Sequence, residues 1–186
     1  MSLVEITTAT HGVELDLKYA TSDNFTGRPV YSRAACYLHP EAEKLLIAAR
    51  DLAATQGYRL RILDAFRPTE AQWKLWKHTP DPDFLADPRR GSPHSRGVAV
   101  DLTLINKASG AALDMGTPFD LFNVKSHHGN PLISPLAQKN RLLLMGLMTT
   151  AGWDFFRNEW WHYQLFDSRD FELFSDADLP EPMTAP

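Results

Sequence analysis

Two short segments far apart in the chain carry side chains that suit a single metal ion, and this constrains the fold more than any other feature. Residues 92–101 read SPHSRGVAVD and contain His94 and Asp101, while residues 159–162 read EWWH and contain Glu159 and His162. Two histidines and one aspartate can hold one zinc ion and leave a fourth position open, which is how a catalytic zinc site differs from a structural one. A chain that uses all three must bring both segments together.

The composition is that of an ordinary globular protein. The chain has 186 residues, a hydrophobic fraction of 44% and a charged fraction of 23%, so we expect one domain over residues 1–186 with a substantial core. The net charge of −4 argues against nucleic acid as a partner. Cys36 is the single cysteine, which excludes an intrachain disulfide. Residues 1–18 lack a signal-peptide pattern and no stretch approaches about 20 apolar residues, so we expect a cytoplasmic protein without a membrane partner.

Three segments carry the signals of amphipathic helices. In residues 40–55, apolar side chains recur at helical spacing, and Gly57 follows their end. Pro68 suits the first turn of a second helix that runs to about residue 77. Ser134 is the expected cap of a third helix, which ends before Gly152.

Four segments are predicted as strands from their apolar or alternating patterns, namely residues 13–19, 58–64, 98–104 and 160–166. The strands and helices lack a regular alternation, which favours a single-domain α+β fold with a mixed or antiparallel sheet. Residues 105–131 lack periodicity and are long for a loop, as functional segments often are. The acidic, proline-rich residues 172–186 are expected to fray.

The metal hypothesis competes with plainer interpretations of the same residues. In its predicted strand, Asp101 points away from the core-facing side chains and toward a surface or a cleft. His94 can instead cap a loop, with Asp101 on the surface. Residues three apart in a strand face opposite sides, so Glu159 and His162 share a site only if Glu159 lies at the bend before the strand. The alternative is an aromatic core strand in which His162 is a satisfied core residue.

Arg67 ends the second predicted strand, in the motif DAFRP (residues 64–68). The proline after it holds its backbone extended. The end of a strand is a common place for a side chain that takes part in function. The plainer interpretation is a surface ion pair with Asp64 or Glu70, and such pairs contribute little to stability. Together with the metal residues, Arg67 makes the chain look like a zinc hydrolase.

Considered jointly, the motifs resemble those of the D-alanyl-D-alanine dipeptidases, the zinc peptidases associated with vancomycin resistance and with D-amino-acid recycling from peptidoglycan. The resemblance covers most of the chain. The matching segments are LKYATSDNFTG (17–27), DAFRP (64–68), SPHSRGVAVDLTL (92–104), DMG (114–116), FD (119–120), NRLLL (140–144) and EWWH (159–162). The resemblance implies the α+β fold that this family shares with zinc D,D-carboxypeptidases and the hedgehog signalling domain.

The resemblance also implies a zinc-dependent hydrolysis of D-alanyl-D-alanine. One zinc ion is expected on His94, Asp101 and His162, with a zinc-bound water as the nucleophile. Glu159 is the implied general base and acid, outside the ligand set. Arg67 is the implied stabiliser of the oxyanion.

Four further residues match positions near the substrate of this family. Asp120, in preference to Asp114, is the implied partner of the free amine of the dipeptide. Tyr19 and Ser92 are implied to lie close to the substrate. A dipeptide is the expected partner because a longer peptide would place an uncharged amide against a buried carboxylate, which costs free energy.

Other functions use the same residues. A D,D-carboxypeptidase or L,D-endopeptidase would apply the same zinc site to peptidoglycan stem peptides, but these lie outside the membrane and the chain lacks a recognisable signal peptide. A non-catalytic zinc-binding or cell-wall-binding module would keep the fold and lose the chemistry, yet zinc binding alone needs neither Glu159 nor Arg67. A plain α+β domain without metal is the third alternative. A homo-oligomer and the physiological role stay open.

Overall fold

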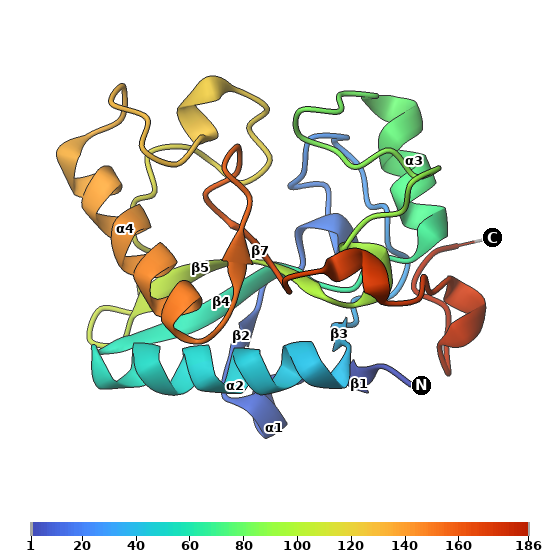
Figure 1. Cartoon of the computed structure of the whole chain (residues 1–186), viewed down its shortest axis with the longest axis horizontal. Helices are drawn as coiled ribbons and strands as arrows, with labels where there is room; N and C mark the ends of the chain where they lie inside the picture. Colours follow the sequence, from blue (N-terminus) through green and yellow to red (C-terminus); the bar gives the residue numbers. More distant parts are fainter. Residues whose placement is uncertain (1, 186) are drawn as a thin grey trace.

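A mixed β-sheet runs through the middle of the molecule (Figure 1). The computed structural model describes residues 2–185 of the chain. The strands are β1 (Val4–Glu5), β2 (Glu14–Leu15), β3 (Tyr37–Leu38), β4 (Tyr58–Asp64), β5 (Ala99–Asn106), β6 (Asp154–Phe155) and β7 (His162–Gln164). The main sheet has the order β2-β4-β5-β7-β6, with β2 parallel to β4 and the other neighbours antiparallel, while β1 and β3 form a separate antiparallel pair.

The helices within residues 2–185 are α1 (Thr8–His11), α2 (Pro40–Thr55), α3 (Thr69–His78) and α4 (Pro135–Thr150). Figure 1 shows α2 running along one side of the sheet, with α4 rising beside it. This arrangement confirms the predicted single-domain α+β fold with a mixed sheet. Among the described residues, no helix has the length and apolar character that crossing a bilayer requires.

Local sequence signals account for the two long helices. In α2, Pro40 takes the first position, and the helix buries a stripe of small and branched apolar side chains, Ala42, Leu46, Ala49 and Ala53. At the start of α4, the Ser134 hydroxyl accepts a hydrogen bond from the backbone N–H of Ala137 (3.1 Å). The predicted bounds of α2 and of β4 are confirmed.

β5 is the strand that connects the core to the site. Its register pairs Asp101 with His162 on β7 and, across an irregularity, with Asp64 on β4. Side chains alternate along a strand, so Val100 and Leu102 enter the core that α2 covers, while Asp101 points to the opposite side of the sheet.

The first and the last predicted strands are shorter than expected. β2 stops at Leu15, and the chain then forms a 3-10 turn (Lys18–Ala20) that buries Tyr19. β7 begins only at His162 because a tight turn precedes it, in which the backbone N–H of His162 donates to the carbonyl of Glu159 (3.4 Å). Alternating or apolar patterns do not distinguish such turns from strands.

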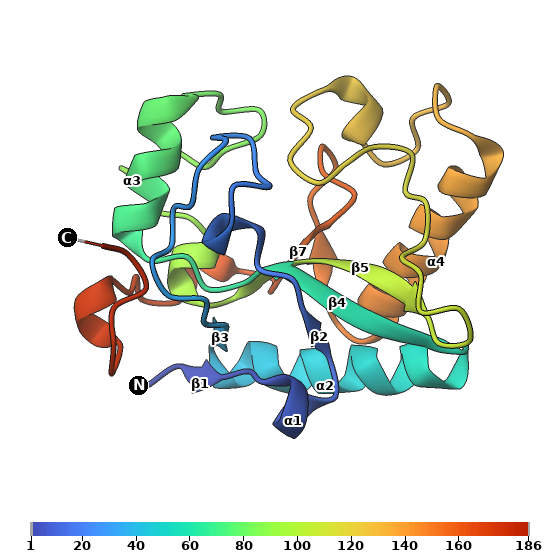
Figure 2. The ribbon, with the colours of Figure 1, turned by 180° about the vertical axis from the view of Figure 1, so that it is seen from behind.

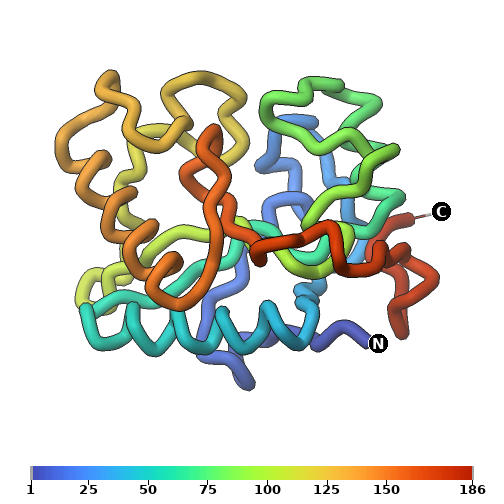
Figure 3. Tube along the Cα trace, in the orientation of Figure 1, coloured from blue at the N-terminus to red at the C-terminus, as the bar shows by residue number. Residues whose placement is uncertain are grey.

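The expected fraying of residues 172–186 is wrong for residues 172–185, the part that the structure describes. Met183 is fully buried, and its carbonyl accepts a hydrogen bond from the backbone N–H of Ser32 (2.7 Å). The Asp176 carboxylate accepts from the backbone N–H of Met183 (2.7 Å), so an acidic residue folds the segment back on itself instead of facing solvent. In Figure 3 the red C-terminal segment lies beside α3.

Irregular segments stand on the side of the sheet opposite to α2 (Figure 2). Residues 79–93 stand there together with helix α3, and residues 107–134 form a second group. Arg141 of α4 holds the second group, because its guanidinium donates to the carbonyls of Met115 (2.6 Å) and His127 (3.0 Å). The predicted functional loop is therefore ordered by a buried arginine.

Candidate active site

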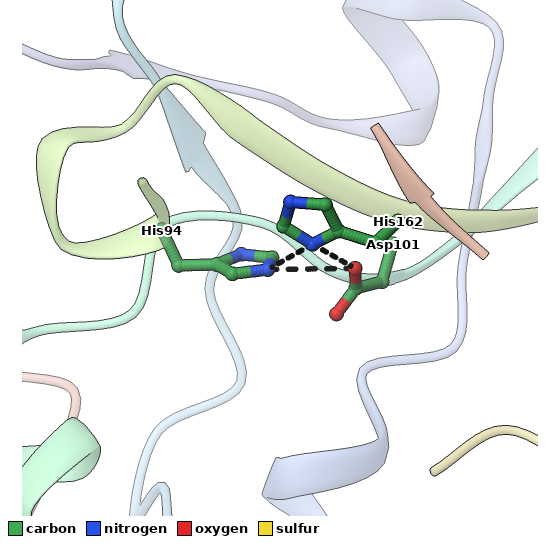
Figure 4. Close-up of side chains that lie close together, drawn as sticks. All are labelled: His94, Asp101 and His162. Carbon is green, nitrogen blue, oxygen red and sulfur yellow. Dashed lines mark hydrogen bonds and ion pairs between the residues drawn. The ribbon is translucent and has the colours of Figure 1, made fainter. Parts of the chain in front are cut away.

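Side chains from three elements meet at one point (Figure 4). His94 belongs to a 3-10 turn before β5, Asp101 to β5, and His162 to the start of β7. His94 Nε2 lies 3.1 Å from His162 Nδ1 and 3.4 Å from Asp101 Oδ1, and His162 Nδ1 lies 3.1 Å from the same oxygen. All three residues are buried. The structure thus brings together the three residues chosen from the sequence as metal ligands.

In each histidine ring, the outer nitrogen, which is the one that points away from the meeting point, already has a carbonyl partner. His94 Nδ1 lies 2.6 Å from the carbonyl oxygen of Ala65, and His162 Nε2 lies 3.0 Å from Gln164 Oε1. A neutral imidazole carries one N–H, and a carbonyl oxygen only accepts, so the N–H belongs on the outer nitrogen of each ring. The two inner nitrogens therefore present lone pairs to each other and to the Asp101 carboxylate.

This donor set fits a divalent metal ion. Lone pairs and a carboxylate that face one another at 3.1–3.4 Å repel unless a cation lies among them. Ligands about 2.1 Å from a tetrahedral metal lie about 3.4 Å apart, close to these separations. Burial disfavours the charged form of Asp101, and a proton on either inner nitrogen would lower the pKa of that carboxyl group; a cation among the three groups would supply the same stabilisation.

Glu159 lies in the turn before β7, where the metal hypothesis requires it. Its Oε2 is 3.9 Å from His162 Nδ1, and the residue is buried. Burial, followed by the negative charges of Asp101 and Asp120, raises the pKa of Glu159 well above its ordinary value. A carboxyl group beside a metal site and outside its ligand set is suited to taking up and releasing a proton.

Arg67 pairs with Asp64, but the pair is buried and not at the surface, so the plainer interpretation of a surface ion pair does not hold. Arg67 is 4% exposed, and its Nε donates to Asp64 Oδ2 (2.9 Å). Its Nη2 lies 3.6 Å from Asp101 Oδ2, next to the metal residues. Burial disfavours the charge, but Asp64 and other neighbours raise the pKa of Arg67 well above its ordinary value. Glu70 instead accepts a backbone hydrogen bond from the C-terminal segment.

A cavity of about 230 Å³ joins these groups. The proposed ligands, Glu159 and Arg67 line one part of it. Tyr19 and Ser92, which the resemblance places near the substrate, line it as well. Its remaining wall is largely apolar and includes Pro82, Phe84, Leu85, Phe122 and Phe156.

Asp120 presents an unsatisfied carboxylate oxygen in this cavity. Its backbone has a positive φ of 57°, and its Oδ2 is enclosed without a hydrogen-bond partner among residues 2–185. Burial raises the pKa of Asp120 well above its ordinary value. An enclosed carboxylate oxygen without a donor is costly, so a ligand that brings a donor to it gains free energy.

Asp114 does not line the cavity, so its position gives no support to a contact with the substrate amine. The residue is exposed, and its carboxylate accepts a hydrogen bond from the backbone N–H of Gly116 (2.8 Å). Its own carbonyl accepts from the side chain of Asn140 (2.8 Å). Asp114 thus shapes the loop that carries Asp120 and does not line the site.

Three polar side chains that hold the site were missed in the sequence. Tyr31 donates to Asp64 (2.7 Å), Gln72 accepts from Arg67 (3.0 Å), and Gln164 faces His162. Tyr31 lies in a loop and Gln72 in a helix, and neither belongs to a motif. The position of Gln164 was detectable, because residues two apart in a strand share a face.

Comparison with known proteins identifies the family of this chain. A family model described as D-ala-D-ala dipeptidase matches residues 1–179. The chain is 42% identical to the D-alanyl-D-alanine dipeptidase of Escherichia coli (strain K12), over 94% of this chain and 90% of that protein. It is 40% identical to the enzyme of that name from Enterococcus faecium (84% and 88% covered) and 34% identical to that from Streptomyces coelicolor (89% and 92% covered). The chain is therefore a peptidase and belongs to the D-Ala-D-Ala dipeptidase family.

Proposed function

We propose that this protein hydrolyses the peptide bond of D-alanyl-D-alanine. The observation that carries the proposal is the convergence of the three metal-suited residues with Glu159 and Arg67 on one cavity. Metal binding alone needs neither of these two side chains, so their presence supports hydrolysis over simple binding. The names of the three relatives support the substrate.

Zinc is the metal that we propose for His94, Asp101 and His162, because imidazole and carboxylate ligands suit it. When bound, zinc would act as a Lewis acid toward water and the scissile carbonyl. Glu159 is the proposed general base: it takes the proton from the attacking water and passes it to the leaving amine. Its buried position at 3.9 Å from His162 Nδ1 supports a role beside the ligands, not among them.

Arg67 is the proposed stabiliser of the charge that develops on the carbonyl oxygen. Its guanidinium is a fixed cation at the wall of the cavity and is nearly inaccessible to water. In such a site, one well-placed donor to an oxyanion contributes about 3–4 kcal/mol to transition-state stabilisation.

Asp120 is the proposed partner of the substrate's free amine. Its enclosed Oδ2 lacks a donor among the described residues, and an ammonium group supplies one together with a positive charge. This pairing is available only when the substrate begins one residue before the scissile bond. Asp120 therefore supports a dipeptide over a longer peptide, in which an uncharged amide would meet the carboxylate.

The test is amine release from D-alanyl-D-alanine by the zinc-loaded protein, with Glu159→Ala measured alongside. We expect release by the unaltered protein, a loss of kcat of about 100-fold or more in Glu159→Ala, and equal zinc content in both. Glu172→Ala, which removes an exposed carboxylate outside the cavity, is the matched control and should keep its rate. A Glu159→Ala rate within about tenfold of the unaltered protein would reject the base assignment. Zinc-loaded protein that releases amine only from longer wall peptides would reject the dipeptidase proposal.

A further inference from the structure

The guanidinium of Arg67 is held along two of its edges by Asp64 and Gln72, which do not line the cavity themselves. Asp64 Oδ2 accepts from Nε (2.9 Å) and lies 2.7 Å from Nη2. Gln72 Oε1 accepts from Nη1 (3.0 Å). Tyr31 in turn donates to the second oxygen of Asp64 (2.7 Å). The cation is thus clamped between a carboxylate and an amide.

The Gln72 amide can satisfy its two partners in only one orientation. Its Nε2 donates to the carbonyl oxygen of Ala86 (2.6 Å), while its Oε1 accepts from Arg67. A guanidinium only donates and a carbonyl only accepts, so a flipped amide would lose both bonds. Gln72 is 1% exposed, and a buried amide that lost both bonds would carry a substantial penalty. The orientation of Gln72 therefore determines the position of Nη1.

We propose that Gln72 is a positioning residue for the reaction, which aims the free N–H groups of Arg67 at the developing oxyanion; this rests on the proposed function. A guanidinium has five N–H groups; the clamp engages one on Nε and one on Nη1 by hydrogen bonds and one on Nη2 by the ion pair with Asp64. One N–H on Nη1 and one on Nη2 are left, on a side chain that lines the cavity. Without Gln72, the guanidinium can rotate about the Asp64 contact, and the two free N–H groups then no longer point at the developing oxyanion.

The neutral amide also preserves the charge that the reaction uses. Asp64 already places one full negative charge against Arg67, and Asp101 Oδ2 lies 3.6 Å from Nη2. A carboxylate at position 72 could accept from Nη1, but it could not donate to the Ala86 carbonyl and would cancel more of the positive potential that the oxyanion meets. An amide orients the cation without that loss.

The kinetic test compares Gln72→Met with Asn158→Ala. Methionine keeps the helix and the volume but removes both hydrogen bonds. Asn158 Nδ2 donates to the carbonyl of Asp83 (2.9 Å). Residues 79–93 contain both Asp83 and Ala86, so Asn158→Ala removes one side-chain hydrogen bond to this segment, as Gln72→Met does. Unlike Gln72→Met, it removes no contact of Arg67. We expect kcat for D-alanyl-D-alanine to fall about tenfold to 100-fold in Gln72→Met, since a misplacement of about 1 Å can cost up to that factor. KM, zinc content and the kcat of Asn158→Ala should stay within about twofold of the unaltered protein.

A second readout distinguishes a misplaced Arg67 guanidinium from a general loss of structure. A phosphinate analogue of the dipeptide mimics the tetrahedral anion, so its Kd should rise in Gln72→Met by the factor by which kcat/KM falls. A kcat within about twofold of the unaltered protein, an effect confined to KM, or an equal loss in Asn158→Ala would overturn the proposal. If Gln72→Met does not fold, Gln72→Asn keeps an amide in place, withdraws it by one methylene, and should lower kcat in the same way.

A third readout does not depend on turnover, so it tests the positioning role of Gln72 separately from the proposed hydrolysis of D-alanyl-D-alanine. The Nη protons of Arg67 should give resolved NMR signals in the unaltered protein, because the clamp slows rotation about the Cζ–Nη bonds. They should broaden in Gln72→Met and stay resolved in Asn158→Ala. Unchanged signals in Gln72→Met would overturn the positioning role even if the dipeptide proved not to be the substrate. An active Arg67→Ala would instead reject the proposed role of Arg67 itself.

Discussion

His94 Nε2 and His162 Nδ1 lie 3.1 Å apart although the N–H of each ring is already engaged by a carbonyl on its far side. With the N–H on the far side of each ring, neither nitrogen has a proton to offer the other, and the carboxylate of Asp101 lies 3.1–3.4 Å from both. The fold therefore holds three electron-rich groups together at a cost in free energy that a bound cation would offset.

Zinc should therefore raise the stability of the protein. Binding to the folded state adds about 2.7 kcal/mol when free metal exceeds its Kd by about 100-fold. The expected result is a higher Tm after zinc is added to chelator-treated protein, and the loss of that increase in His162→Ala. His78→Ala removes an exposed histidine outside the site and should respond to zinc as the unaltered protein does. An equal response in His162→Ala would contradict the ligand assignment.

Asp120 and Asp114 offer a matched pair of carboxylates on one loop. Asp120→Asn keeps the shape but removes the charge that is proposed to meet the substrate amine, so kcat/KM for the dipeptide should fall. The expected loss is about tenfold to 100-fold, equivalent to about 1.5–3 kcal/mol for a hydrogen bond to a charged group. Asp114→Asn alters an exposed side chain outside the cavity and should change kcat/KM by less than about threefold. Steady-state kinetics of both variants decide the assignment, and a larger loss in Asp114→Asn would reverse it.

Phe84 and Phe122 close part of the cavity wall from opposite segments. Their rings are stacked with centroids 5.1 Å apart and planes at 5°, and both line the cavity. Phe84→Ala should open this wall and raise the ratio of kcat/KM for a D-alanyl tripeptide to that for the dipeptide. The expected increase is about twofold to tenfold, equivalent to about 0.5–1.5 kcal/mol for one aromatic pair. Phe166→Ala, which removes an exposed ring outside the cavity, should leave the ratio unchanged; equal ratios in both variants would show that the pair does not limit access.

The elements predicted best were those with local signals. The bounds of α2 follow from a proline at its start, a periodic apolar stripe and a glycine after its end, all readable within one segment. The convergence of His94, Asp101 and His162 was predicted because the chemistry of the donor set and the family motifs both pointed to it. A bend at Glu159 was the condition for Glu159 and His162 to share a site, since a regular strand would have sent the two side chains to opposite faces, and the structure has a turn there.

The parts that were missed depend on contacts between distant segments. Gln72 was predicted to lie in a helix, but nothing local shows that its amide meets the carbonyl of Ala86. Composition indicated an exposed C-terminal tail, yet Met183 is buried against loops from the other end of the chain. The sequence favoured Asp120 over Asp114 only through the family motifs, and the backbone conformation of their loop is what places Asp120 alone at the cavity.

His128 should make the protein less stable in mild acid. Burial, together with the positive charge of Arg141, lowers the pKa of His128 from 6.5 to about 4. Its Nε2 is enclosed without a hydrogen-bond partner among residues 2–185, and its ring packs against Phe155 with centroids 5.2 Å apart. The unfolded chain takes up a proton on this ring below pH 6.5, whereas the folded protein resists it until about pH 4. The free energy of unfolding therefore falls as the pH drops through this window and is unaffected by this group above it.

The difference between pH 8 and pH 5 should be about 2 kcal/mol from this one residue. Urea unfolding of the metal-free protein at both pH values measures it, and removing the metal keeps ligand protonation on His94 and His162 from adding a loss of bound zinc. Carboxylates elsewhere contribute to the total pH dependence, so the informative quantity is the change on substitution. His128→Gln, which cannot be protonated, should reduce the pH 8 to pH 5 difference by about that amount, whereas His78→Gln should not. An equal reduction in the two variants would mean that His128 titrates as an ordinary exposed histidine.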